Sequence, residues 1–180
     1  MTPQEAQKEG GEGLAAWINL LQVQSVVVDS LERDLAGAGR IPLPWVEVLM
    51  QVTSAPDGRM KMQELAHSVL LSKSGVTRLV DRMVDAGLME RRACESDRRA
   101  VHAVATPKGR AALRDALPTH ARGLRSRFTE VLTPAELAML RTTLQKVLDA
   151  GGFSPTPCPS GLEDVEDPAA GSSAPAPAKR

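Results

Sequence analysis

The chain has 180 residues, and its 22 Lys and Arg are balanced by 22 Asp and Glu, so the formal net charge is zero. This length fits one domain with or without a tail, and zero net charge argues against a nucleic-acid partner unless positive charge is concentrated locally. Two cysteines, Cys94 and Cys158, exclude a disulfide framework and fit a reducing compartment. Aromatic residues make up only 2 %, so the core must be built mainly from aliphatic residues and Met.

Both ends of the chain have the composition of disordered segments. Residues 1–12 are polar, and 19 of the 30 residues in 151–180 are Pro, Gly, Ser or Ala, so neither end can offset the entropy of ordering. The N-terminus lacks the features of a secretory signal, and no run approaches the roughly 18 apolar residues of a membrane span. We therefore predict a cytoplasmic protein without membrane contact, structured at residues 13–150.

Helical periodicity begins after the polar N-terminus. Apolar residues spaced three and four apart run from Leu14 to Leu35, and this helix is expected to stop near Gly37. A second helix is predicted to open at Pro42 and Pro44. It ends before a Pro-Asp-Gly turn, in which proline presets φ and glycine accepts a positive φ.

Residues from about 62 to 87 have the pattern of a helix-turn-helix. A short helix at about 62–69 precedes Ser72, which is expected to cap a second helix, and Gly87 has the place of a C′ glycine at its end. The apolar face of the second helix is expected to be buried and consists of Val76, Leu79, Val80, Met83 and Val84.

A β-hairpin and two further helices complete the pattern. Strands at 88–94 and 100–105 flank a charged tip, Thr106 caps a helix that Pro118 is expected to kink or split near Leu117, and a capping box opens the last helix. The fold class is therefore mainly α with a small β-hairpin wing. A winged helix-turn-helix at about 42–106 is flanked by long N- and C-terminal helices at about 13–38 and 107–150.

The zero net charge is a sum of oppositely charged segments. Residues 60–127 carry 14 Lys and Arg against 7 Asp and Glu, a net +7, whereas residues 1–59 carry −4, residues 128–150 carry −1 and the tail carries −2. The predicted helix-turn-helix and wing are therefore basic, which is the electrostatic footprint of a DNA-binding surface.

Polar residues of the second helix and of the wing tip are candidates for DNA contact. Major-groove readers use the N-terminal residues of the second helix, where Arg, Lys, Ser and Thr match base edges or phosphates, and a cationic wing tip can enter a narrow minor groove. The candidates are Ser72, Lys73, Ser74, Thr77 and Arg78 on the helix and Asp97, Arg98 and Arg99 on the wing. The alternative is a solvated helix face and an ordinary β-turn.

Two motifs stand at a fixed spacing in this region. One is Asp97-x-Arg99, five residues, and then Ala105-Thr106-x-x-Gly109; the other is the helix from Ser72 to Met83, followed by Gly87-Leu-Met-Glu-Arg91. Together they resemble the MarR (multiple antibiotic resistance regulator) family of winged-helix transcription factors, over about residues 14–150. Ala105 departs from the family's usual Leu, which weakens a packing contact at the base of the wing.

The resemblance implies an obligate homodimer that binds a pseudo-palindromic operator in double-stranded DNA, usually as a repressor. Many members release DNA when a small aromatic or anionic effector binds. The helix candidates would face the major groove, and Arg98 or Arg99 would enter the minor groove, with Asp97 orienting Arg99. The apolar stripes of the terminal helices agree with dimerisation, because exposed rows of this kind are an aggregation liability.

An effector site and the absence of metal are further expectations. Trp17, Trp45 and His120 fall where the family's ligand cleft is expected; the alternative is packing for both Trp and a partly exposed interface position for His120. No cofactor is predicted, and the three His show no metal-ligand spacing.

Two other functions stay open at this point. A winged-helix module that binds only proteins would show no operator binding and no steep salt dependence. An enzyme that used Cys94 with His102 would lack a third, orienting group, and the chain has no Gly-rich nucleotide loop. We therefore predict a regulator that is not an enzyme, in which Cys94 is either an inert or a redox-active thiol.

Overall fold

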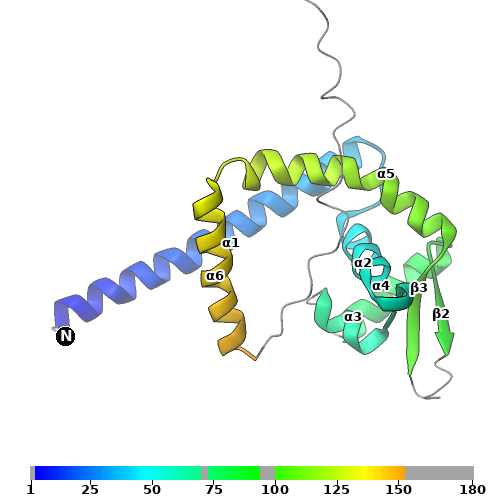
Figure 1. Cartoon of the computed structure of the whole chain (residues 1–180), viewed down its shortest axis with the longest axis horizontal. Helices are drawn as coiled ribbons and strands as arrows, with labels where there is room; N and C mark the ends of the chain where they lie inside the picture. Colours follow the sequence, from blue (N-terminus) through cyan, green and yellow to red (C-terminus); the bar gives the residue numbers. More distant parts are fainter. Residues whose placement is uncertain (1–2, 70–72, 94–99, 153–180) are drawn as a thin grey trace, which may run out of the picture.

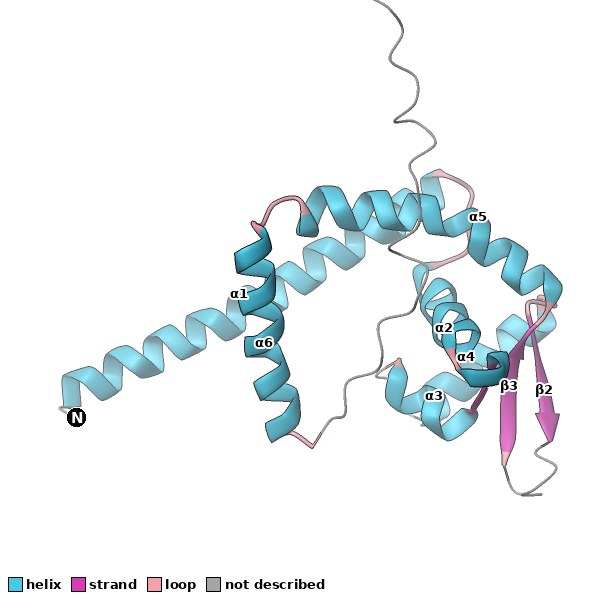
Figure 2. Ribbon diagram, in the orientation of Figure 1, coloured by secondary structure: helices cyan, strands magenta, loops and turns pink. Residues whose placement is uncertain are grey.

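The structure, a computed structural model, describes residues 3–69, 73–93 and 100–152. In chain order its elements are α1 (Pro3–Gly37), α2 (Leu43–Ser54), η1 (Pro56–Gly58), β1 (Arg59–Lys61), α3 (Met62–Ser68), α4 (Lys73–Asp85), β2 (Met89–Ala93), β3 (Val101–Ala105), α5 (Pro107–Leu124), η2 (Arg125–Thr129) and α6 (Pro134–Ala150). Figure 1 shows a lobe formed by α2, α3, α4 and the strands, which α5 joins to the extended helices α1 and α6. The predicted mainly α fold with a small wing is confirmed, as Figure 2 shows.

Helix α1 is longer than the sequence pattern predicts. It ends at Gly37 as expected, but it begins at Pro3 rather than near residue 13, so it covers most of the segment predicted to be disordered. Proline in the first turn of a helix costs no hydrogen bond, and the Glu-Ala-Gln-Lys stretch that follows has high helix propensity.

The apolar part of α1 corrects a second expectation. By length and composition alone, Gly11–Gly37 is long and apolar enough to cross a membrane. Asn19, Gln22 and Gln24 interrupt the apolar run, so it is not evident as a continuous stretch, but the segment is still apolar on average. Little of this stretch is buried within the chain, and Trp17 is 56 % exposed. The helix therefore presents an uncovered apolar surface.

The sheet has three strands rather than the predicted two. The strand order is β1-β3-β2, and both pairs are antiparallel. Strand β1 was missed because three residues, Arg-Met-Lys, are too few to show an alternating pattern. The predicted turn before it is present, with φ of 63° at Asp57 and 61° at Gly58, and it directs the chain into the edge strand.

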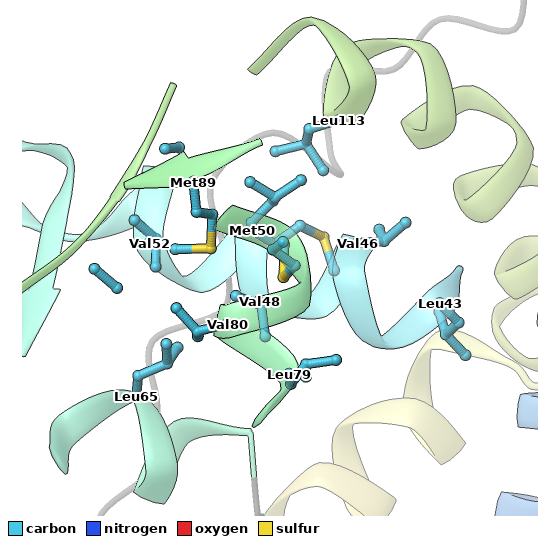
Figure 3. Close-up of a cluster of buried hydrophobic side chains, with 14 of the residues drawn as sticks. Leu43, Val46, Val48, Met50, Val52, Leu65, Leu79, Val80, Met89 and Leu113 are labelled. Atoms are coloured by element: carbon cyan, nitrogen blue, oxygen red, sulfur yellow. The ribbon is translucent and has the colours of Figure 1, made fainter. Parts of the chain in front are cut away.

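The core is centred on α2 and packs the lobe together. Figure 3 shows apolar side chains from α2, α3, α4, β2 and α5 converging on one cluster. The predicted inner face of α4 is confirmed, since Val76, Leu79, Val80 and Met83 are buried, and Val84 packs at the edge. Each such side chain contributes about 2 kcal/mol through burial, so the orientation of α4 is fixed by the core.

Helix α5 runs through Pro118 without a break, so of the two predicted outcomes, a kink or a split near Leu117, the split does not occur. Pro118 removes one main-chain hydrogen bond, but its neighbours Ala116, Thr119 and Ala121 are buried, and this packing holds the helix together across the proline. The regular α-helical pattern changes only later, at the π-helical turn η2.

Both predicted threonine caps are present. The Thr106 hydroxyl oxygen accepts a hydrogen bond from the Gly109 N–H at 3.0 Å, and that of Thr133 accepts one from the Glu136 N–H at 3.3 Å. In return, the backbone N–H and the hydroxyl of Thr133 donate to the Glu136 carboxylate, which lowers the pKa of Glu136. Local sequence signals therefore set the starts of α5 and α6 correctly.

Candidate nucleic-acid interface

Helix α4 presents a polar turn on the side opposite its buried face. Ser74, Thr77 and Arg78 are exposed, and Arg78 Nε donates to the carbonyl oxygen of Ser74 at 3.3 Å. The spacing of three and four residues puts these side chains on one face of the helix. The structure thus brings together three of the residues predicted to contact DNA.

A hollow between α3 and α4 adds two residues that the sequence analysis did not single out. It is lined by Met62 and Gln63 of α3 together with Ser74, Thr77 and Arg78 of α4. The exposed amide of Gln63 offers both a donor and an acceptor, the combination that pairs with adenine. Sequence reasoning missed both residues because they reach this surface only through the packing of α3 against α4.

The other predicted contacts lie outside the described residues. These are Ser72 and the wing-tip residues Asp97, Arg98 and Arg99, and for Lys73 the structure describes only its place as the first residue of α4. Their roles at a phosphate or in a minor groove remain predictions. Cys94 also lies outside the described residues.

Two arginines of β2 are paired with carboxylates rather than left free. Arg91 lies 2.9 Å from the Asp81 carboxylate of α4, and it also donates to the carbonyl oxygen of Thr77 at 3.3 Å. Arg92 pairs with Glu90 on its own strand at 2.5 Å. Part of the positive charge counted for this region is therefore balanced within the lobe.

The C-terminal end of α4 is fastened to the start of α5. Thr106 Oγ1 donates to the carbonyl oxygen of Gly87 at 2.8 Å, and Lys108 Nζ donates to that of Ala86 at 2.7 Å. Gly109 allows the two segments to approach closely, because a Cβ there would lie 2.0 Å from the Leu88 carbonyl oxygen. These contacts tie the start of α5 to the end of α4.

The three effector candidates occupy different environments. Trp17 is exposed on α1, Trp45 packs partly buried against the core, and His120 is only 6 % exposed, which corrects the expectation of a partly exposed position. Burial lowers the pKa of His120, and its Nδ1 has no hydrogen-bond partner within the described part of the chain. None of the three lines the polar hollow between α1 and α5, whose residues include Asp34 and Arg127.

No metal centre is seen in residues 3–69, 73–93 and 100–152: they contain no group of three or more His, Cys, Asp or Glu side chains placed to hold an ion.

The geometry described above is that of a winged helix-turn-helix protein. A helix with an exposed polar face is supported by a hydrophobic lobe, a three-stranded sheet stands beside it, and long helices flank the lobe.

Comparison with known proteins agrees with this class. The family model described as "MarR family" matches residues 44–101. The crystal structure of AbsC, a MarR family transcriptional regulator from Streptomyces coelicolor, is 31 % identical, with a TM-score of 0.71 over 83 % of this chain and 95 % of that one. Sco3205 from the same organism, solved in complex with DNA, is 27 % identical, with a TM-score of 0.72 over 81 % and 90 % of the two chains.

A curated relative extends the match to another organism. The HTH-type transcriptional regulator MhqR of Bacillus subtilis (strain 168) is 31 % identical over 90 residues, which are half of this chain and 61 % of MhqR. The chain belongs to the MarR family of transcriptional regulators. The resemblance inferred from the two motifs is confirmed, and these relatives are regulators rather than enzymes.

Proposed function

We propose that this protein is a cytoplasmic, DNA-binding transcriptional regulator that reads a pseudo-palindromic operator as a homodimer and responds to a small effector. The observation that carries the proposal is the exposed face of α4, where Ser74, Thr77 and Arg78 stand together on a helix fixed by its buried side. Such a helix presents its N-terminal residues to the major groove, where Arg matches guanine and Ser or Thr matches base edges or phosphate.

The flanking helices support the homodimer. None of the residues of α6 is buried within the chain, and Met139 on that helix is 72 % exposed. Apolar residues on α1 and α6 are exposed as well, among them Leu14, Trp17, Ile18, Leu21, Val26, Val147 and Leu148. A second copy would cover both apolar surfaces and place two α4 helices about one DNA turn apart.

The wing supplies the second half of the proposed contact. Arg98 or Arg99 at its tip would enter the minor groove, with Asp97 orienting Arg99, while Ser72 and Lys73 would bind a phosphate at the start of α4. Strands β2 and β3 pair and support a hairpin at this place. Ala105, which stands where the family usually has Leu, is buried at the base of this hairpin.

An effector site is proposed at the junction between the lobe and the flanking helices. Trp45 on α2 and His120 on α5 lie on helices that pack against each other. The buried Nδ1 of His120 has no hydrogen-bond partner in the described part of the chain, so a ligand that entered between these helices would supply one. Trp17 would join this site only through dimerisation, because it lies on the uncovered part of α1.

Selection of bound DNA from a random-sequence pool tests the proposal. The full chain is expected to enrich a two-fold symmetric sequence with half-sites about 10 base pairs apart and to bind it with a steep salt dependence. Arg78→Gln and Arg99→Ala should each weaken binding by about tenfold or more. Arg40→Gln is the matched control, because Arg40 is exposed and lies between α1 and α2, away from α4.

The same preparation distinguishes the alternatives. A chain that enriches no sequence and shows no salt dependence would be an interaction module rather than a regulator. Sedimentation equilibrium is expected to give a dimer, and Met139→Glu should shift it toward monomer, because a buried charge in an apolar interface is costly. A monomeric wild-type chain would contradict the homodimer.

A further inference from the structure

Arg91 is directed at the recognition helix by the alternation of β2. Met89 and Arg91 are two residues apart and therefore point to the same side of the sheet. Their partners on β3, Ala105 and Ala103, are both buried, so this is the side that faces the helices. Arg91 thus stands at the point where the apolar core ends and the wing begins.

The Arg91 guanidinium contacts α4 at two places one helical turn apart. One NH group lies 2.9 Å from the Asp81 carboxylate and also 3.3 Å from the carbonyl oxygen of Thr77. Thr77 is on the exposed face that would read DNA, and Asp81 is the next residue along that side of the helix. Arg91 therefore connects the wing directly to the reading turn of α4.

The charge of Arg91 is balanced by the Asp81 carboxylate 2.9 Å away, so it is less available to a phosphate than that of an arginine without an ion pair. A planar guanidinium can satisfy a carboxylate and a carbonyl at the same time, which Lys does poorly.

We propose that Arg91 is a positioning residue, which fixes the reading turn of α4 relative to the wing through Asp81 and Thr77 and does not itself bind DNA. This inference rests on the proposed DNA-binding function. It assigns Asp81, an acid on a DNA-facing helix, a supporting role instead of a repulsive one. The two halves of the DNA contact, helix and wing, are thereby held as one unit.

The test measures affinity for the selected DNA as a function of salt concentration. Arg91→Gln and Asp81→Asn should each weaken binding by about tenfold, and the double variant should be no weaker than either single variant, because one interaction is lost in all three. The slope of log K against log salt should stay unchanged in these variants. The comparison variant Arg78→Gln, which removes a cation proposed to contact the DNA directly, should reduce that slope.

The sign of the Asp81→Asn effect decides between the two roles. If Arg91 bound a phosphate directly, removal of the nearby negative charge would strengthen DNA binding, and Arg91→Gln would lower the salt slope; either result overturns the proposal. Exchange of the pair, Asp81→Arg with Arg91→Asp, should recover part of the affinity lost in Arg91→Asp alone, because the ion pair returns but a carboxylate at position 91 cannot donate to the Thr77 carbonyl oxygen. Thermal unfolding of each variant separates loss of fold from loss of positioning.

Failure of the underlying function gives a different result. A wild-type chain without DNA affinity would overturn the proposed function together with this role. Wild-type binding that Asp81→Asn leaves unaltered would overturn only the role of Arg91.

Discussion

Arg127 and Asp34 are 93 residues apart in the sequence, and their side chains form a two-point ion pair in the structure. Arg127 Nη2 lies 3.1 Å from Asp34 Oδ1, and Nη1 lies 2.5 Å from Oδ2. The pair joins η2 to α1 beside Gly123, where a Cβ would lie 2.8 Å from Leu31. Close packing and a paired charge therefore fix α1 against the end of α5.

Removal of this ion pair is expected to cost a modest amount of stability. Arg127→Gln should lower the free energy of unfolding by about 1 kcal/mol, because the geometry is bidentate but both side chains are about one-third exposed and are screened by solvent. Urea denaturation at fixed protein concentration measures the loss, which should shrink in high salt. Arg40→Gln is the control, since the Arg40 side chain makes no contact of this kind in the described part of the chain, and equal losses for the two variants would contradict the role of the pair.

Gly109 is expected to tolerate no side chain. Gly109→Ala should destabilise the lobe by about 3 kcal/mol, because its Cβ would overlap the Leu88 backbone and force α5 away from β2. Gly37→Ala is the matched control: nothing lies within 4 Å of its Cβ position, so its effect should stay within about 0.5 kcal/mol. Thermal unfolding of the two variants measures both effects. A Gly109→Ala protein with wild-type stability would show that the two segments separate easily.

His120 is expected to make stability depend on pH below neutrality. Burial lowers the pKa of His120 in the folded chain below its ordinary value of 6.5, so between these two pKa values the unfolded chain binds more protons than the folded chain. Stability should therefore fall as pH drops below about 6.5 and level off below the folded pKa. His120→Gln should lack this part of the decline.

Urea midpoints of the wild type and of His120→Gln, measured from pH 8 to pH 5, check the prediction about His120. The other titrating groups are common to both proteins, so the difference between the two curves isolates the imidazole. Parallel curves over this range would contradict the buried neutral state of His120.

The helix-turn-helix could be predicted from sequence because its signals are local. The spacing of apolar residues three and four apart marks the buried face of α4, and Gly87 marks the end of that helix. Thr106 and Thr133 mark the starts of two later helices. Each signal depends on residues within one or two turns of the chain. Over that distance, the spacing of residues along the sequence determines which side chains lie next to each other. The face that presents Ser74, Thr77 and Arg78 follows from the same periodicity.

Long-range contacts decided the features that the sequence did not reveal. Strand β1 exists only because β3 supplies its partner, and α5 continues through Pro118 because its neighbours are buried. Likewise, the burial of His120 and the pairing of Arg91 with Asp81 depend on which side chains meet after the elements pack.

By itself, then, the sequence determined the order of the helices and of the hairpin, the basic character of the central region and the exposed polar face of α4. Only the tertiary structure decided which charges are balanced, which polar groups lose water and how the helix is held. The physical reason is that helix periodicity and capping are encoded by near neighbours, whereas burial and ion pairing depend on residues that the chain brings together from a distance.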